Sequence, residues 1–500
     1  MLKLVIKKIC CCLLICLVTN AGFAKDFLIT DFGAKPGLTE LNTISINSAI
    51  RACYENGGGR VIIPAGIFRS GTLLMKDHVE LFLEIGSTLF ASTDLKDFPV
   101  QPQPVYRSQK DPGGWRALIY ANEVSNIAIT GFGTIDGNGA NQKPDPNSLF
   151  KGDLDGRPRN ILFISCKNIH VEGIHMLNSG IWNQHYLNCE DVLVDRINVY
   201  NHSNRNNDGI DIDGCRRLTL SNSIFDTDDD AIVLKSTGIA ACEDIVITNC
   251  VVSSFCNAIK AGTESTGGFK NISISNCVVT PSRNDHLISG TKNGIAGLSL
   301  EIVDGGIMDG VSINNITIEG TDCPLFVRLG NRARKHTKEA PEPSVGIMRN
   351  IVISNVVAYH TGNFSSSITA IPGHYIENVS LSNVQFYNKG GLKRGGYIED
   401  VQKVKEDEKG YPQPTVWKEL PSSGLFIRHT KNIQVRGLML NSEEPDPRIP
   451  VIAMDVDGLQ IQSISKINNS TADVFFKGLD VKNIFIDTPL GWKKEVSKIY

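Results

Sequence analysis

The chain lacks a surplus of basic charge. It carries 50 lysines and arginines against 53 aspartates and glutamates, a formal net charge of −3. A protein that binds nucleic acid needs a basic surface to neutralise phosphates, so the composition argues against a nucleic-acid partner. With 41% hydrophobic residues over 500 positions, the chain can bury a large core.

Long apolar runs are scarce as well. The run at residues 9–18 is too short to cross a bilayer, which takes about 20 residues. It follows three lysines and precedes small residues that end at Ala24, which is the pattern of a secretory signal peptide. We therefore expect residues 1–24 to be removed, no transmembrane segment to follow, and the mature chain to be exported to the periplasm or the extracellular space.

Cysteine pairs with C-x-x-C spacing are absent, which argues against a zinc site. Nine of the 13 cysteines lie beyond residue 24, and an odd number in an exported protein leaves at least one thiol outside the intramolecular disulfides. Several recur near expected strand ends, namely Cys166, Cys189, Cys215, Cys250 and Cys277. We interpret these as small buried apolar residues rather than disulfides, and we expect no metal and no other cofactor.

A turn followed by a short strand recurs along most of the chain. Asn168, Asp191, Arg217, Asp244 and Asn271 follow one another at 23, 26, 27 and 27 residues, and alternating apolar residues come after each. A repeat of this length stacks parallel strands about 4.8 Å apart, so that equivalent positions form columns. The pattern resumes towards the C-terminus, which predicts one all-β solenoid domain over residues 25–500.

Residues 27–92 are expected to cap the solenoid. Asn42 or Thr43 can begin a helix, and the glycines at 57–59 can end it. The apolar face of this helix would cover the open end of the first coil with Ile46, Ala49, Ile50 and Cys53. The segment resembles the N-terminal cap of right-handed parallel β-helices that act on pectin.

Three carboxylates gather on two adjacent coils. Asp208 lies 22 residues before Asp230, at the equivalent position of the repeat, and Asp229 stands beside Asp230. Like charges this close raise one another's pKa, which suits acid/base catalysis better than architecture. An inverting glycosidase needs one protonated and one ionised carboxyl roughly 6.5–9.5 Å apart. Asp226 and Asp228, in the same run, are expected to cap turns instead.

These residues carry a family resemblance. The sequence from Asn206 to Asp211 is similar to the Asn-Thr-Asp-Gly motif of glycoside hydrolase family 28, the polygalacturonases and rhamnogalacturonan hydrolases. The Asp229-Asp230 pair resembles that family's Asp-Asp motif at its usual distance. The resemblance implies a right-handed, pectin-lyase-like parallel β-helix, a general acid at Asp230, a water held and deprotonated by Asp208 and Asp229, and a substrate contact for Asn207.

Two departures from the family pattern concern substrate choice. The Gly-His-Gly of the polygalacturonases corresponds here to Cys256-Asn257-Ala258, so that Asn257 replaces the histidine beside the acid. Their Arg-Ile-Lys, which grips a galacturonate carboxylate, corresponds to Ser299-Leu300-Glu301, where Glu301 has the opposite charge. Rhamnogalacturonan hydrolases of the family also lack that histidine. The departures predict that plain polygalacturonate is a poor substrate.

Trp182 and His185 resemble a Trp-x-x-His stretch of the family, one coil before Asp208. There the indole could stack on a sugar ring and the imidazole could bond its hydroxyls, or both could be core residues. His202 could replace the missing histidine or could be a turn residue.

Three more charged residues are candidates for substrate binding. Lys260 shares a strand with Asn257 and is expected to face the sugar, with Glu301 one coil away if the two strands stack in register. Arg328 is the candidate clamp for a carboxylate. Asp213 and Lys235 match across coils in the same way, and we expect them to form a solvated surface pair.

Four long segments interrupt the repeat and are expected to gather on the binding face, at residues 94–116, 138–155, 331–346 and 387–423. The last two follow the aspartate cluster and could close one end of the groove, which favours exo action. The sequence thus predicts an exported hydrolase that cleaves an acidic, pectic polysaccharide or oligosaccharide with inversion. A polysaccharide lyase on the same fold and a non-catalytic glycan-binding β-helix remain as alternatives.

Overall fold

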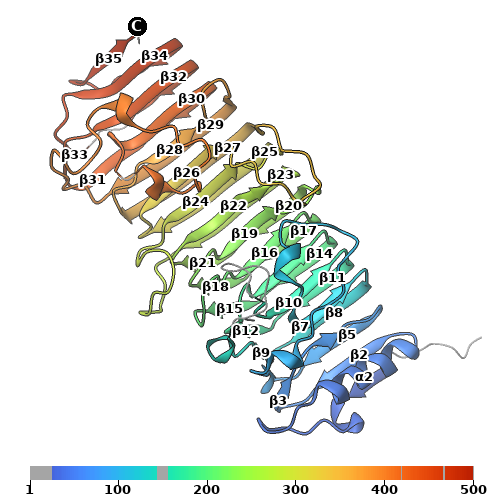
Figure 1. Cartoon of the computed structure of the whole chain (residues 1–500). Coiled ribbons are helices and arrows are strands. Elements are labelled where there is room, and N and C mark those ends of the chain that lie inside the picture. The colour runs from blue at the N-terminus through green and yellow to red at the C-terminus, as the bar shows by residue number, and fades with distance from the viewer. Residues whose placement is uncertain (1–24, 144–155, 418, 465–467, 499–500) are drawn as a thin grey trace, which may run out of the picture.

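A computed structural model describes residues 25–143, 156–417, 419–464 and 468–498. The predicted signal peptide at residues 1–24 lies outside these residues. Figure 1 shows one long solenoid of stacked parallel strands, with the N-terminal helix at one end and the last strands at the other. The prediction of a right-handed parallel β-helix with an N-terminal capping helix is confirmed. The described residues contain no helix that is both long and apolar enough to cross a membrane.

Each strand of the central coils pairs in parallel with the strand three places later, so every coil contributes to three faces. The first face, which carries the candidate site, is made of β4 (Leu73–Leu74), β7 (Ala117–Asn122), β10 (Arg159–Ile164), β13 (Gln184–Leu187), β16 (Ile210–Asp213), β19 (Ile232–Ser236), β22 (Asn257–Ser265), β24 (Ala296–Ile302), β26 (Cys323–Leu329) and β28 (Ser366–Thr369).

The other two faces complete the coils. One is made of β1 (Lys25–Leu28), β2 (Gly59–Ile63), β5 (Val79–Leu83), β8 (Ser125–Gly131), β11 (Lys167–Glu172), β14 (Glu190–Asp195), β17 (Arg216–Ser221) and β20 (Cys242–Thr248). The other is made of β3 (Gly66–Ser70), β6 (Ser87–Ala91), β9 (Thr134–Asp136), β12 (His175–Leu177), β15 (Asn198–Asn201), β18 (Ile224–Thr227) and β21 (Val251–Ser254).

The strands towards the C-terminus are mostly longer and run around the corners between faces. They are β23 (Gly268–Val279), β25 (Ile307–Glu319), β27 (Ile347–Thr361), β29 (Ile376–Asn388), β30 (Ser422–Arg436), β31 (Met439–Asp446), β32 (Ile449–Gln462), β33 (Asn468–Ser470), β34 (Val474–Ile486) and β35 (Lys493–Ser497). Short 3-10 turns lie in the connections, as η1 (Ile29–Phe32), η2 (Leu95–Asp97), η3 (Asp111–Gly113), η4 (Gly139–Asn141), η5 (Val401–Lys403) and η6 (Pro414–Val416).

The repeated turn residues of the sequence have a common backbone conformation. Asn168, Asp191, Arg217, Asp244 and Asn271 all have a positive φ, between 52° and 59°. Asn and Asp adopt this left-handed conformation more readily than other residues with a side chain. Some of these side chains also bond along the stack, as Asn271 Nδ2 does to Asp244 Oδ1 at 3.0 Å. The conformation at the corner therefore explains why Asn and Asp mark the repeat.

Apolar columns fill the interior. Ile210, Ile232, Ile259 and Leu298 occupy matched positions on four successive strands, and all are at most 2% exposed. The alternate residues of these strands point outwards and carry the charged side chains of the site. All nine cysteines in the described part of the chain are buried and unpaired, which confirms their interpretation as buried apolar residues.

The capping helix α2 (Thr43–Glu55) is confirmed, and it buries the four predicted side chains, Ile46, Ala49, Ile50 and Cys53. Asn42 is the residue before the helix, but its side chain makes no capping hydrogen bond. Its Oδ1 instead accepts from the amide of Lys35 at 2.7 Å, which ties the helix start to the preceding loop.

Candidate active site

The strand register places the acidic residues in one column. Extending the pairing of β10, β13, β16, β19 and β22 towards their starts aligns Arg159, Trp182, Asp208, Asp230 and Asn257 on five successive strands. Asp208 precedes β16, and Asp229 and Asp230 lie in the turn that leads from β18 into β19. The stacking of Asp208 on Asp230, predicted from the repeat, is present.

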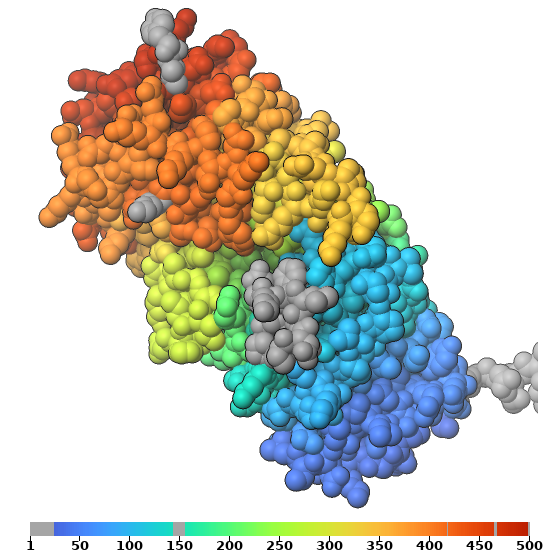
Figure 2. Space-filling model, viewed as in Figure 1, coloured from blue at the N-terminus to red at the C-terminus, as the bar shows by residue number. Residues whose placement is uncertain are grey.

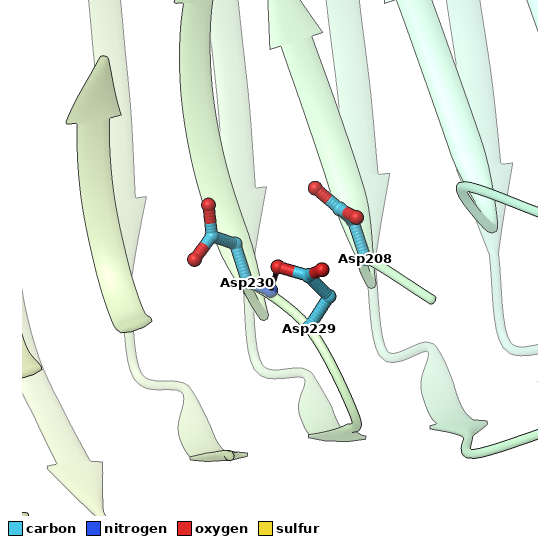
Figure 3. Close-up of side chains that lie close together, drawn as sticks. All are labelled: Asp208, Asp229 and Asp230. Carbon is cyan, nitrogen blue, oxygen red and sulfur yellow. Dashed lines mark hydrogen bonds between the residues drawn. The ribbon is translucent and has the colours of Figure 1, made fainter. Parts of the chain in front are cut away.

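Figure 3 shows the carboxyl groups of Asp208, Asp229 and Asp230 grouped at the starts of adjacent strands. One oxygen from each lies within 4.8 Å of the others. This separation is shorter than the roughly 6.5–9.5 Å expected from the sequence for an inverting pair. Asp208 and Asp230 are on directly adjacent strands, about 4.8 Å apart, which explains why their nearest oxygens are so close.

Asp230 is held in its ionised form. Its Oδ1 accepts from the backbone nitrogen of Asn257 at 3.1 Å and from the side-chain Nδ2 of the same residue at 2.6 Å. Its Oδ2 lies 3.1 Å from Lys260 Nζ. Burial acts to raise the pKa of Asp230, but the ammonium groups of Lys260 and Lys235 and the bond from Asn257 outweigh it and lower the pKa below its ordinary value. Asp230 is therefore suited to accept a proton.

Asp229 differs from Asp230 in its exposure and in the direction of its pKa shift. It is the only half-buried member of the three; the other two are at most 4% exposed. Burial, followed by the charge of Asp230, raises the pKa of Asp229 to about 6. Its Oδ1 accepts the amide of Asp230 at 2.8 Å. A carboxyl that is protonated below pH 6 and partly exposed is suited to donate a proton to a bound substrate.

Asp208 lies near Lys235, which the structure buries although the sequence predicts it on the surface. Lys235 Nζ is 3.8 Å from Asp208 Oδ2, 3.5 Å from Asp211 Oδ1 and 3.7 Å from Glu264 Oε2. Burial and then the charges of Asp211 and Asp229 raise the pKa of Asp208 well above its ordinary value. The predicted surface pair of Asp213 and Lys235 is thus wrong: both are buried, and Asp213 bonds Thr237 and His185 instead. The sequence does contain a signal for this buried lysine. In the alternating Ile-Asp-Ile-Asp strand, Asp211 points outwards, towards Lys235.

Trp182 and His185 lie beneath the site rather than in contact with solvent. His185 is fully buried, its Nε2 is 3.0 Å from Asp213 Oδ2, and burial lowers its pKa to about 4. Trp182 is 4% exposed and packs edge-on against His185, with 5.0 Å between ring centroids. The core interpretation holds for both side chains, and the predicted substrate contacts of His185 and Trp182 are corrected.

Asn207 supports the turn that carries Asp208. It is fully buried; its Oδ1 accepts the amides of Ser203 and Asn204, and its Nδ2 donates to the carbonyls of Ser179 and Ile181. The predicted substrate contact for Asn207 is therefore corrected to a positioning role. All four bonds fix backbone around the site.

The remaining members of the aspartate run hold a neighbouring loop, as predicted for turn-capping residues. Asp228 accepts the amides of Ile288 and Ser289 at 2.9 and 2.8 Å. Asp226 binds His202 Nε2 at 2.9 Å and also accepts the amide of Arg283. His202 is thereby occupied on another face and does not replace the missing histidine.

The predicted register of Lys260 and Glu301 is shifted by two residues. Lys260 pairs with Ser299, and Glu301 pairs with Arg328 on the next strand. The long Lys260 side chain still brings its Nζ within 3.8 Å of Glu301 Oε2. Glu301 itself is fully buried and accepts from Ser299 and Thr263. It helps to balance the charge of Lys260 and is not exposed to a substrate.

Arg328 supports a loop instead of presenting its guanidinium to solvent. It is 3% exposed, and it donates to the carbonyls of Ala370, Glu406 and Asp407 at 2.9, 2.5 and 3.2 Å. The predicted carboxylate clamp is therefore corrected. The same bonds fix the segment 387–423 against the solenoid.

Three of the four predicted loops contact the face that carries the site or the turn that follows β24. From segment 94–116, Lys110 Nζ pairs with Glu264 Oε1 at 2.8 Å; from segment 331–346, Arg332 Nε binds Asp304 at 2.9 Å; from segment 387–423, the Tyr411 hydroxyl lies 3.4 Å from Lys260 Nζ. Figure 2 shows blue, yellow and orange segments meeting near the middle of one face of the solenoid. Most of segment 138–155 lies outside the described residues.

The three catalytic candidates also offer the carboxylate oxygens that a divalent cation requires. Two ammonium groups compete for them, however, because Lys235 and Lys260 both lie within 4.0 Å of members of the cluster. These lysines supply positive charge where a cation would otherwise do so.

Comparison with known proteins finds similar chains and a matching family profile. The profile of the family described as Glycosyl hydrolases family 28 matches residues 53–406. A "Probable polygalacturonase" of Vitis vinifera is 28% identical over 222 residues, 42% of this chain and 44% of that protein. An "Exo-poly-alpha-D-galacturonosidase" of Dickeya chrysanthemi is 27% identical over 257 residues, 43% of this chain and 42% of that protein. The chain thus spans less than half of the length of these curated relatives.

Among solved structures, an exopolygalacturonase from Thermotoga maritima has the same fold. It superposes with a TM-score of 0.64 at 20% identity, covering 83% of this chain and 91% of that one.

Proposed function

Because the chain belongs to family 28 of the glycosyl hydrolases, we propose that it hydrolyses glycosidic bonds of an acidic, pectic polysaccharide or oligosaccharide. The observation that carries the proposal is the contrast between the half-buried Asp229, with its raised pKa, and the adjacent Asp230, held ionised by Lys260 and Asn257. The predicted signal peptide supports export to the periplasm or the extracellular space, where the protein would meet such a polymer.

In the proposed reaction, Asp229 donates its proton to the glycosidic oxygen as the bond from that oxygen to the anomeric carbon breaks. A water held by Asp208 and Asp230 attacks the anomeric carbon from the opposite face, and Asp230 takes its proton. The family resemblance gave the acid role to Asp230. We assign it to Asp229, because a carboxyl paired with a lysine at 3.1 Å favours its ionised form.

The three-carboxylate arrangement supports inversion. Close carboxyl pairs, about 5–5.5 Å apart, are typical of retaining enzymes, in which one carboxylate attacks the sugar directly. Here Asp230 is held by three hydrogen-bonding groups, and Asp208 faces the same space. Asp208 and Asp230, on adjacent strands, are suited to hold a water molecule between them.

The function is tested with purified protein and defined pectic oligosaccharides. We expect new reducing ends, an inverted anomer in the first product seen by proton NMR, and full activity in chelator. A product that absorbs in the ultraviolet, together with loss of activity in chelator, would identify a lyase instead. Binding without turnover on every oligosaccharide would identify a glycan-binding protein.

The pH dependence follows from the charge of Asp229. Because its pKa is raised to about 6, the proton needed for catalysis is present below pH 6 and is lost as the pH rises through that value. Asp230 has a lowered pKa and stays ionised into the acid range. We expect kcat/KM to fall above about pH 6 while the folded state persists. A fall that begins only above about pH 8 would contradict Asp229 as the acid.

Substrate preference is expected to differ from that of ordinary polygalacturonases. Asn257 and Glu301 stand where those enzymes carry histidine and lysine, and Lys260 is already paired with Asp230. Unbranched polygalacturonate should be cleaved slowly in its interior, and bonds next to rhamnose or to a modified or terminal uronate should be preferred. Rapid depolymerisation of plain polygalacturonate, measured by viscosity, would refute this.

Exo action is proposed from the loop that reaches Lys260. Tyr411, which is 51% exposed, extends from segment 387–423 to the edge of the aspartate cluster. The segment would then form a wall at one end of the groove. Such a wall would admit the end of a polysaccharide and block a polysaccharide that continues past the site. Wild-type protein should then release one small product at early times, whereas Tyr411→Ala should yield a ladder of intermediate lengths. Tyr411→Phe, which keeps the ring, is the matched control and should retain the single product.

A truncation of this loop would be a poorer test of the wall. Arg428 donates to the carbonyls of Val404 and Lys405, and Arg328 donates to those of Glu406 and Asp407. Deleting residues 403–413 would leave both buried guanidinium groups without these acceptors. An unchanged product profile in Tyr411→Ala would count against the wall.

A further inference from the structure

Three cationic side chains surround the indole of Trp182, on the side of Asp208 that faces away from Lys260. Lys110 Nζ, Lys235 Nζ and Arg159 Cζ lie 5.0, 4.7 and 5.2 Å from the ring centroid. Lys110, Arg159 and Lys235 are called the cationic cluster below. They come from segment 94–116, β10 and β19, so the fold and not one local motif brings them together.

Arg159 has unused hydrogen-bonding capacity although it is only 2% exposed. Its Nε and Nη2 have no hydrogen-bond partner among the described residues. These two nitrogens form one edge of the guanidinium, and that edge matches the two oxygens of a carboxylate. A buried donor left unpaired costs free energy, and burial lowers the pKa of Arg159 to about 10. An anionic partner would relieve both effects.

Carboxylates lie near the cluster, but burial weakens the acidity of some of them. Glu264 pairs with Lys110 and Lys235, and Lys110 and Lys235 together with other charges lower its pKa well below the ordinary value despite burial. Asp211 faces Lys235, but burial raises its pKa to about 8, and neither of its oxygens has a hydrogen-bond partner in the described part of the chain. Asp208, 3.8 Å from Lys235, has a raised pKa as well, so Glu264 is the ionised carboxylate that pairs directly with the lysines of the cluster.

The cluster also lies in line with the catalytic residues. Arg159 is two strands from Asp208 in the column described above, about 10 Å at the spacing of parallel strands. A polymer that runs along the stack past Asp230 and Asp208 would therefore reach the strand that carries Arg159.

We propose that the cationic cluster is a subsite for the carboxylate of a uronate residue, with the Nε–Nη2 edge of Arg159 as its bidentate contact and Lys110 and Lys235 as additional charges. The identification of the anion as a uronate rests on the proposed function. The subsite would take over, from the opposite side of the aspartates, the carboxylate recognition that Ser299-Leu300-Glu301 lacks.

The test is calorimetric titration of the full chain with galacturonate and with galactose, which differ in the carboxylate. Wild-type protein should bind galacturonate more tightly than galactose. Arg159→Met should lose about 10- to 100-fold in galacturonate affinity, the range for charged hydrogen bonds, with galactose affinity unchanged. Arg159→Lys should fall between them, because it keeps the charge and loses the bidentate edge. Arg196→Met, an exposed arginine paired with Glu172, is the control and should bind as wild type.

Equal affinity of wild-type protein for the two sugars, or equal losses for both in Arg159→Met, would overturn the subsite. If Arg159→Met does not fold, Lys110→Gln decides, because Lys110 is on a loop and should show the same selective loss. Hydrolysis of pectic oligosaccharides is measured separately. Turnover without Arg159-dependent uronate binding refutes the subsite alone, and uronate binding without turnover refutes the proposed hydrolysis alone.

Discussion

Asp230→Asn should remove nearly all turnover, a loss of about 10²–10⁴-fold, the range that a catalytic acid or base contributes. The amide keeps an oxygen that can accept from Asn257 but cannot take the proton of the attacking water. Turnover of a pectic oligosaccharide, measured by reducing ends, should show this loss while sugar binding remains. Retention of more than roughly a tenth of the wild-type rate would exclude Asp230 from catalysis.

The sequence alone suggests that this variant unfolds as wild type does, but the structure changes that expectation. The Lys260 side chain is 1% exposed and its Nζ lies 3.1 Å from Asp230, so the substitution leaves a buried ammonium with Glu301, at 3.8 Å, as the remaining carboxylate partner among the described residues. Breaking a buried pair costs up to about 3–5 kcal/mol, and a lower melting temperature is expected. Asp228→Asn is the matched control: it changes the same charge in the same run and should keep full turnover, because Asp228 holds the amides of Ile288 and Ser289.

The fold could be predicted from the sequence because its repeat has a local cause. Each coil needs a corner residue with positive φ, and the recurring Asn and Asp residues record that need in the sequence. Alternation within the strands then fixes which side chains face inwards. The stacking of Asp208 on Asp230 followed from the same spacing.

The surroundings of the aspartates could not be predicted in the same way. Lys110 and Tyr411 come from segments without a repeat, which lie more than 100 residues from their partners Glu264 and Lys260. The strand leading to Glu301 follows a long turn, and its register slipped by two residues relative to the prediction. Side chains alternate along a strand with a period of two residues. The predicted side of the strand for Glu301 was therefore right, and its predicted cross-strand partner, Lys260, was wrong.

The burial of the side chains shows which of the predicted substrate contacts are absent. His185, Asn207, Glu301 and Arg328 all occupy suitable positions in the linear pattern, yet each is at most 3% exposed and bonded to the protein itself. A sequence motif shows that a polar residue faces the groove side of a strand. It does not show whether another segment has already taken its hydrogen bonds.

The acid and base roles can be separated by changing the leaving group. Asp229→Asn should lose about 10²–10⁴-fold on an oligosaccharide, whose sugar leaving group needs a proton. On an aryl galacturonide with an acidic phenol, which leaves without protonation, the same variant should lose far less. Asp230→Asn should be impaired on both substrates, because the attacking water must be deprotonated in each case. Initial rates of the two variants on the two substrates decide the assignment. Selective rescue of Asp230→Asn by the aryl substrate would return the acid role to Asp230 and reject the role that the raised pKa of Asp229 supports.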